Sequence, residues 1–162
     1  MVGAVALIAV AALGGPEDEE KPDGPVLPTT FRLGVSRDRG GAPEVLLDSA
    51  SAQIGDQLSF TVSLPEAAPV VVVEVNTNGE VTPVFPATGT DAAPVAKGES
   101  TLPVTITLSG NPGVDRFVAL ACARGMSVAD ASTLSLGVPE SGKVPPMYPG
   151  CQESVVRLRK LL

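Results

Sequence analysis

Apolar and polar residues alternate along residues 57–64, QLSFTVSL, and this two-residue period constrains the fold more than any other feature of the chain. Leu58, Phe60, Val62 and Leu64 fall on one side of an extended segment, and two serines and a threonine fall on the other. Successive side chains of a β-strand point to opposite faces of a sheet. The segment is therefore predicted to be a strand with one face in a core and the other in water.

Similar segments recur along the chain between turn residues. Residues 70–75 are nearly continuous in valine, which is typical of a central strand covered on both faces. Asn78 and Gly79 tolerate positive φ, so a hairpin turn is expected between this strand and the next. Beyond residues 57–64, the predicted strands are residues 31–36, 45–47, 70–75, 80–85, 101–108 and 114–122.

The remaining segments complete the predicted fold class. Residues 86–100 show no sustained pattern and are expected to form a surface loop, and apolar residues at helix-like spacing predict a short helix over residues 152–162. Short strands without intervening helices of crossover length indicate a mainly β fold, an antiparallel β-sandwich or partly open barrel with a short C-terminal helix. An α/β fold is the alternative. Aromatic residues are scarce, so the core is expected to be built from Val, Leu and Ala around four large residues, Phe31, Phe60, Phe85 and Phe117.

An apolar N-terminal segment predicts the compartment. Residues 2–15, VGAVALIAVAALGG, carry no charge and are followed by Pro16 and an acidic run. As a helix the segment would span roughly 20 Å, which is shorter than a bilayer core of about 30 Å. We therefore expect residues 1–15 to be a signal peptide or membrane anchor, residues 16–30 a flexible acidic, proline-rich tether, and residues 31–162 an extracytoplasmic β domain that is periplasmic, membrane-anchored or secreted.

Two alternatives to a signal peptide are consistent with the same segment. No Lys or Arg precedes it, as would be usual for a signal peptide, so it could be the end of a transmembrane helix whose beginning lies upstream of Met1. It could also be a buried Ala- and Val-rich helix of a cytosolic domain. The Pro, Gly and charge content of the residues that follow favours a solvated tether and therefore export.

The chain has two cysteines, Cys122 and Cys151. An even number of cysteines in an exported chain favours a disulfide bond between them. Such a bond would close a loop of about 30 residues and contribute on the order of 3.5 kcal/mol. Two unpaired thiols are the alternative. A metal site is not expected, because the chain has no further Cys pair and no histidine.

The sequence predicts no catalytic residues and no cofactor. Histidine, the commonest general base, is absent, and a net charge of −7 disfavours nucleic acid as a partner. Ser127 and Asp130 have no neighbouring base that would make a nucleophile, and residues 110–113 lack the Gly-Lys-Ser/Thr that completes a phosphate loop. Six scattered carboxylates are interpreted as solvated surface charge: Asp56, Glu66, Glu74, Glu80, Asp91 and Glu99.

A set of turn and core residues carries a family resemblance over about half of the chain. These residues are Ile54, Gly55, Asp56, residues 70–76, Gly79, Glu80, Val81, Val84, Phe85, Pro86, Lys97, Gly98, Leu102, Pro103 and residues 113–121. Their order resembles the bacterial domain-of-unknown-function family 4384, whose members occur in exported or membrane-anchored proteins. The chain departs from that pattern at Pro69 and Val70, where relatives usually place an aromatic pair. The resemblance implies a non-catalytic extracytoplasmic module of the kind attached to regulatory or envelope proteins.

Together these features predict a non-catalytic interaction or sensing module of a bacterial cell envelope. Its expected partners are another envelope protein and, through the N-terminal segment, the membrane. The alternative is a secreted hydrolase or carbohydrate-binding domain that uses carboxylates on residues 86–100. A purely structural envelope protein is a third possibility.

Overall fold

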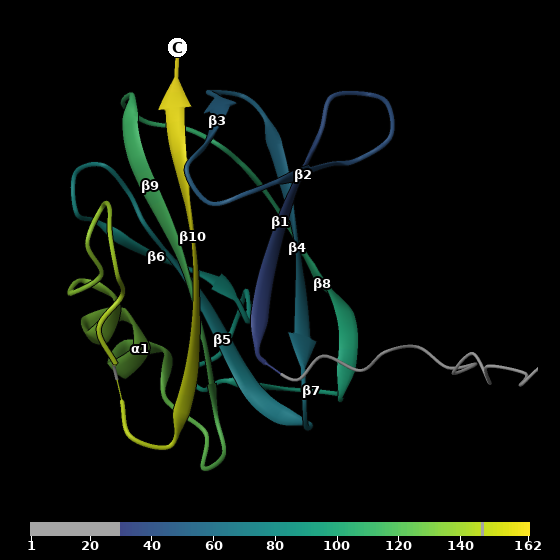
Figure 1. Cartoon of the computed structure of the whole chain (residues 1–162), viewed down its shortest axis with the longest axis vertical. Helices are drawn as coiled ribbons and strands as arrows, with labels where there is room; N and C mark the ends of the chain where they lie inside the picture. The colour runs from purple at the N-terminus through teal and green to yellow at the C-terminus, as the bar shows by residue number, and fades with distance from the viewer. Residues whose placement is uncertain (1–29, 147) are drawn as a thin grey trace, which may run out of the picture.

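Two β-sheets pack face to face, and a short helix lies on the outer side of one of them (Figure 1). The computed structural model describes residues 30–146 and 148–162. In chain order the elements are β1 (Arg32–Asp38), β2 (Glu44–Leu46), β3 (Ala50–Gln53), β4 (Gln57–Leu64), β5 (Ala68–Val75), β6 (Val81–Phe85), β7 (Ala93–Val95), β8 (Gly98–Thr107), β9 (Gly113–Cys122), α1 (Val128–Ser135) and β10 (Cys151–Leu161).

The strands form two separate sheets. Sheet A has the order β2-β1-β4-β8, and sheet B has the order β3-β10-β9-β5-β6, with β7 also paired to β5. Every pair is antiparallel except β3 with β10, which is parallel. The described chain is therefore a mainly β protein with the sandwich form of the predicted fold class, and the α/β alternative is wrong.

The strands with the clearest sequence patterns form as predicted. Strand β4 spans Gln57–Leu64, and its side chains alternate between buried and more exposed positions. Strand β5 lies between β9 and β6 with its valines buried, as expected of a strand covered on both faces. The β5–β6 turn places Gly79 at φ 80°, and the Asn76 side chain accepts hydrogen bonds from the backbone N–H groups of Asn78 and Glu80. Local residue types therefore determine both the strands and the turn between them.

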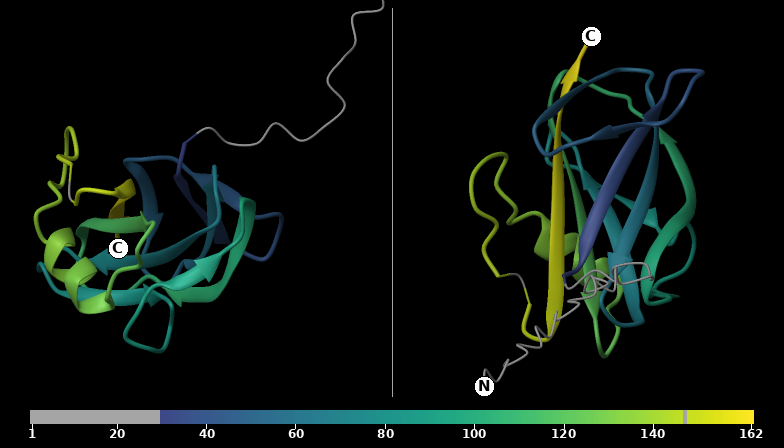
Figure 2. Two further views of the ribbon diagram at one scale, coloured as in Figure 1. Left: turned by 90° about the horizontal axis from the view of Figure 1, so that it is seen from below. Right: turned by 45° about the vertical axis from the view of Figure 1, so that its right-hand side comes forward.

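The hydrophobic core has two layers. Between the sheets lie the four predicted large residues, Phe31, Phe60, Phe85 and Phe117, all of them buried. The rings of Phe60 on sheet A and Phe117 on sheet B meet with their centroids 5.3 Å apart. A second cluster fills the space between the outer face of sheet B and α1, which lies on the side of sheet B away from sheet A (Figure 2).

The predicted C-terminal helix is wrong, because residues 151–161 form strand β10. This strand pairs with β9 along its length and with β3 on its other side. The strand has apolar residues on both faces, with Val155 toward the α1 side and Val156 and Leu158 toward sheet A. Their spacing in the sequence is therefore similar to that of an amphipathic helix. Pairing with two neighbouring strands supplies the backbone hydrogen bonds that an isolated terminal helix would have had to provide within itself.

Three further segments differ from the expectation. Residues 86–100 were expected to be a loop but contain β7 and the start of β8, and neither β3 nor α1 was predicted. Strands of three or four residues are too short for a period to be visible. Helix α1 begins after Ser127, whose Oγ accepts a hydrogen bond from the backbone N–H of Asp130 at 3.0 Å. Ser127 and Asp130, weighed above only as a nucleophile pair, therefore form a helix N-cap.

The predicted leader, residues 1–15, lies outside the described residues, as does the tether except for Thr30. Within the described part of the chain, no helix has the length and apolar character needed to cross a bilayer.

Candidate functional site

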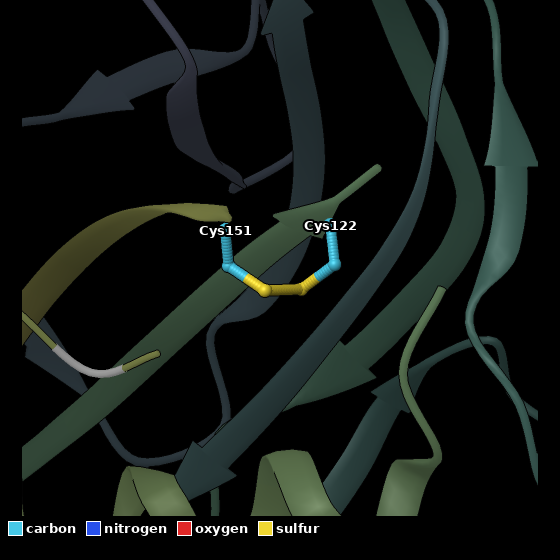
Figure 3. The surroundings of a disulfide bond; sticks show 2 residues. All are labelled: Cys122 and Cys151. Atoms are coloured by element: carbon cyan, nitrogen blue, oxygen red, sulfur yellow. A yellow bond between two sulfur atoms is a disulfide. The ribbon is translucent and has the colours of Figure 1, made fainter. Parts of the chain in front are cut away.

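The two cysteines form the predicted disulfide bond (Figure 3). Cys122 ends β9 and Cys151 begins β10, and the two residues face each other in the ladder with their Cα atoms 4.2 Å apart. Cys122 is buried in the core layer on the α1 side, and Cys151 packs against the same layer. The bond joins two strands rather than a strand and a helix. It is consistent with an oxidising compartment.

A groove runs beside this disulfide bond. It consists of two adjoining hollows of about 600 and 320 Å³ that share Gly125 and Tyr148. The larger hollow is lined by Cys122, Ala123, Arg124, Gly125, Tyr148, Pro149, Gly150 and Cys151, and the smaller by Gly125, Met126, Asp130, Thr133, Leu134 and Tyr148. We call these two hollows the disulfide groove.

Two buried arginines hold the segment between α1 and β10 against sheet B. Arg116 Nη1 donates to the carbonyl oxygen of Val138 at 2.7 Å. Arg157 donates through Nε to the carbonyl oxygen of Pro139 at 3.0 Å and through Nη2 to that of Gly142 at 2.7 Å. Side chains of β9 and β10 thus hold residues 138–142 against sheet B.

The other wall of the disulfide groove is fixed by backbone hydrogen bonds. The N–H of Ala92 donates to the Met126 carbonyl oxygen at 2.8 Å, and the N–H of Val128 donates to the Thr90 carbonyl oxygen at 2.7 Å. These contacts tie the start of α1 to the loop that precedes β7. The α1 side of the disulfide groove is therefore held by the scaffold. On the other side, the N–H of Cys151 donates to the Tyr148 carbonyl oxygen at 3.2 Å.

The lining of the disulfide groove combines apolar and charged side chains. Tyr148 is 53% exposed, Arg124 is exposed, and Met126 and Leu134 are partly buried. Asp130 is the one carboxylate among the lining residues, and its Oδ2 accepts a hydrogen bond from Ser127 Oγ at 2.7 Å. These side chains offer apolar contact and one cation but no pair of acid and base.

A second cluster of polar side chains lies at the opposite end of the β9–β10 ladder. Asp115 and Lys160 are 0% and 1% exposed, and Lys160 Nζ lies 2.7 Å from Asp115 Oδ2. Lys160 Nζ also donates to the Ser109 carbonyl oxygen, at 2.6 Å. Asp115 Oδ1 accepts hydrogen bonds from the backbone N–H of Thr77 at 3.0 Å and from Thr77 Oγ1 at 3.1 Å. A buried ion pair with its remaining hydrogen-bonding positions filled is expected to hold a well-defined geometry.

Glu74 belongs to the same cluster. It is half-buried on β5, the strand on the other side of β9, where it faces Phe117, two residues from Asp115. Burial and the charge of the Asp115 carboxylate raise the pKa of Glu74 to about 7, and Lys160 opposes this effect. The charged cluster, as we call Glu74, Asp115 and Lys160, therefore contains a proton that Glu74 exchanges near neutral pH.

The six carboxylates weighed as surface charge fall into two groups. Glu66 pairs with Lys97 at 2.9 Å with its side chain 82% exposed, and Glu80, Asp91 and Glu99 are also exposed. The interpretation is wrong for Asp56, which is buried, and for Glu74, which is half-buried. Both lie where turns and strand ends fold inward, and sequence position alone does not distinguish such places from the surface.

Asp56 is a structural anchor rather than a solvated charge. Its carboxylate accepts hydrogen bonds from Arg39 Nε at 2.9 Å, from Arg39 Nη2 at 3.0 Å and from the Gln53 backbone N–H at 2.8 Å. Arg37 Nη1 lies 3.6 Å from Asp56 Oδ2. The Arg39 hydrogen bonds hold the pKa of Asp56 below its ordinary value, and the Gln53 N–H contributes in the same direction.

The Asp56→Asn variant is expected to lose about 2 kcal/mol of unfolding free energy at pH 7, because hydrogen bonds to a charged group are lost. A carboxyl group whose pKa is lower in the folded than in the unfolded state stabilises the fold fully at pH values above its unfolded-state pKa. This stabilisation is lost as the pH falls through the folded-state pKa. The difference between wild type and variant should therefore hold at neutral pH and shrink below about pH 4. Urea unfolding at a series of pH values measures it.

Glu66→Gln serves as the matched control for Asp56→Asn, because Glu66 pairs with a lysine at an exposed position. Its effect should stay within about 0.5 kcal/mol at every pH. A loss of stability in Asp56→Asn that does not change with pH would contradict the role of the Asp56 charge.

No group of three or more Cys, Asp or Glu side chains suited to a metal ion occurs among the described residues, and the chain has no histidine. Comparisons of the chain with protein-family models, with curated proteins and with solved structures give no match.

Most residues of both sites were not predicted from the sequence. Arg124, Tyr148, Asp115 and Lys160 were not among the expected site residues. One signal was present for the charged cluster: Glu74 interrupts a run of valines, and Asp115 lies within an apolar strand. A charge within a strand that is buried on both faces requires a partner, and that requirement could have marked both residues.

Proposed function

We propose that this protein is a non-catalytic extracytoplasmic interaction module, and that the disulfide groove binds a segment of another envelope protein. The observation that carries the proposal is the groove itself, a hollow that is lined by both Arg124 and the half-exposed Tyr148. Aromatic and arginine side chains are enriched at protein interfaces, and an exposed tyrosine offers a large contact area at a low entropic cost.

The disulfide bond and the apolar N-terminal residues support the proposed extracytoplasmic location. A bond that joins two neighbouring strands is maintained where thiols are oxidised, as in the periplasm or outside the cell. The partner segment we infer is an extended peptide that places an apolar side chain against Tyr148 and an acidic group near Arg124. The protein as a whole has a net charge of −7, so Arg124 would distinguish this surface from its surroundings.

Site-specific photocrosslinking tests the disulfide groove in the cell. A photoreactive phenylalanine analogue in place of Tyr148 should yield one defined adduct with an envelope protein, and the Arg124→Glu change should reduce its yield about tenfold through charge repulsion. The matched control places the analogue at Val45, which is 66% exposed on sheet A, where no adduct is expected. The proposal fails if position 148 yields no adduct, or the same adducts as position 45.

The hydrolase alternative places catalysis on the carboxylates of residues 86–100. Asp91 accepts a hydrogen bond from Thr90 Oγ1, and Glu99 lies on β8 opposite Ser63 of β4. Among the described residues no hydrogen bond or ion pair joins Asp91 to Glu99. Turnover of a glycan or peptide by purified protein, abolished by Asp91→Asn or Glu99→Gln, would favour that alternative over the binding proposal.

A further inference from the structure

We propose that Lys160 and Asp115 become joined by an amide bond between their side chains, formed within the folded chain with Glu74 as the proton relay. This proposal goes beyond the interaction function and does not depend on it. The amide would be a second covalent link between β9 and β10, at the end of the ladder opposite the disulfide bond.

The register of sheet B brings the charged cluster together. Asp115 faces Leu158 across the β9–β10 ladder, and Lys160 is two residues further along β10. On the other side of β9, Glu74 faces Phe117. Side chains alternate along a strand, so all three residues share the inner face with Phe117 and Leu158. Glu74 and Lys160 are both diagonal cross-strand neighbours of Asp115, at a separation that a long side chain can span.

The contacts place a nucleophile beside an electrophile. Lys160 Nζ lies 2.7 Å from Asp115 Oδ2, which places it close to the carboxyl carbon, and neither side chain is accessible to solvent. Groups held in this way react with effective concentrations far above those reached in solution. Exclusion of water favours amide formation over hydrolysis of the amide.

The charged cluster also supplies the proton transfers. One proton passes from the Lys160 ammonium to Asp115, giving a neutral amine and a neutral acid. Nζ then attacks the carboxyl carbon while Asp115 Oδ1 takes up negative charge, which the two Thr77 donors stabilise. Glu74 donates its proton to the departing hydroxyl and receives one from Nζ. The C–N bond forms, one C–O bond breaks, Oδ2 leaves as water, and Glu74 ends as it began.

Glu74 is suited to this relay because it lies diagonally across from Asp115 on the same face of sheet B, opposite Phe117. Its pKa of about 7 lets it both donate and accept a proton near neutrality. The net reaction consumes one ammonium and one carboxylate and releases one water. It requires no oxidant, activating nucleotide or metal.

Peptide mass spectrometry of the reduced full chain after trypsin digestion tests the proposal. In the wild type, residues 98–116 should be found joined to residues 160–162, at the sum of the two peptide masses minus one water. Trypsin cleaves after Lys97, Arg116 and Arg159, and an acylated Lys160 is not a cleavage site. Recovery of residues 98–116 only as a free peptide would overturn the proposal.

Three variants assign the roles. Lys160→Arg keeps the positive charge but has no amine to acylate, so the joined peptide should disappear. Glu74→Gln cannot relay protons and should slow bond formation about 100-fold, measured as the joined fraction at fixed times after synthesis. Glu80→Gln changes an exposed glutamate just after the turn between β5 and β6. Its joined fraction should equal that of the wild type at every time. Circular dichroism checks that Glu74→Gln is folded.

Two of these variants can also contradict the roles proposed for Glu74 and Lys160. A joined fraction in Glu74→Gln equal to that of the wild type would overturn the relay role of Glu74. A product lacking one water that persists in Lys160→Arg would place the link elsewhere and overturn the pairing of Lys160 with Asp115.

Discussion

Replacing Phe117 with alanine is expected to lower the free energy of unfolding by about 4 kcal/mol, the largest effect of any single substitution we predict. Phe117 is 0% exposed, and its ring packs against Phe60 of the facing sheet with the centroids 5.3 Å apart. Removing it takes away buried apolar surface and leaves a cavity where the two sheets meet.

Urea unfolding followed by circular dichroism measures this loss as a lower midpoint with an unchanged slope. Phe117→Leu, which keeps much of the volume, should cost about 1.5 kcal/mol. Val45→Ala at an exposed position should change stability by less than about 0.5 kcal/mol. A loss below about 1 kcal/mol in Phe117→Ala would mean that the two sheets do not meet at this residue.

The double variant Cys122→Ala with Cys151→Ala is expected to lose about 3.5 kcal/mol of unfolding free energy. The disulfide bond closes a loop with a sequence separation of 29, and opening it returns conformational entropy to the unfolded chain. The paired strands themselves are retained, because the β9–β10 ladder continues for nine further residue pairs beyond the cysteines. The variant should therefore fold to the same structure with a lower unfolding midpoint.

Reductant provides the control for the disulfide prediction. Reduced wild type should resemble the double variant in stability, and reductant should leave the double variant unchanged. Both measurements are best made in the Glu74→Gln background, where the proposed amide bond forms slowly and does not already constrain the same loop. Equal midpoints for oxidised and reduced protein would contradict a stabilising role for the disulfide bond.

The disulfide bond and the charged cluster occupy the two ends of one ladder, and this arrangement relates stability to the proposed function. Cys122 faces Cys151 at one end, and Lys160 faces Gly113 at the other, next to Asp115. Strand β10 is the last element described, and its end lies beside β3 (Figure 1). Links at both ends would keep this strand in place, and with it Cys151, which lines the disulfide groove.

Much of the strand content could be predicted from the sequence because the signals are local. The two-residue period of β4 and the valine run of β5 depend only on neighbouring residues, and Gly79 adopts the positive φ that its turn requires. The pairing of the two cysteines followed from their number and the expected compartment, and it is confirmed. The candidate binding site could not be found in this way, because Arg124 and Tyr148 come to line one hollow only through the folding of two separate loops.

The sequence by itself determined that the chain is a mainly β protein with these turns, since alternation and glycine geometry act within a few residues. Only the tertiary structure decided that the last segment is a strand, because its apolar residues face two core layers and its backbone groups bond to two neighbouring strands. The same holds for the charged cluster. Lys160 and Asp115 are 45 residues apart in the chain, and only the register of β9 with β10 brings them within 2.7 Å.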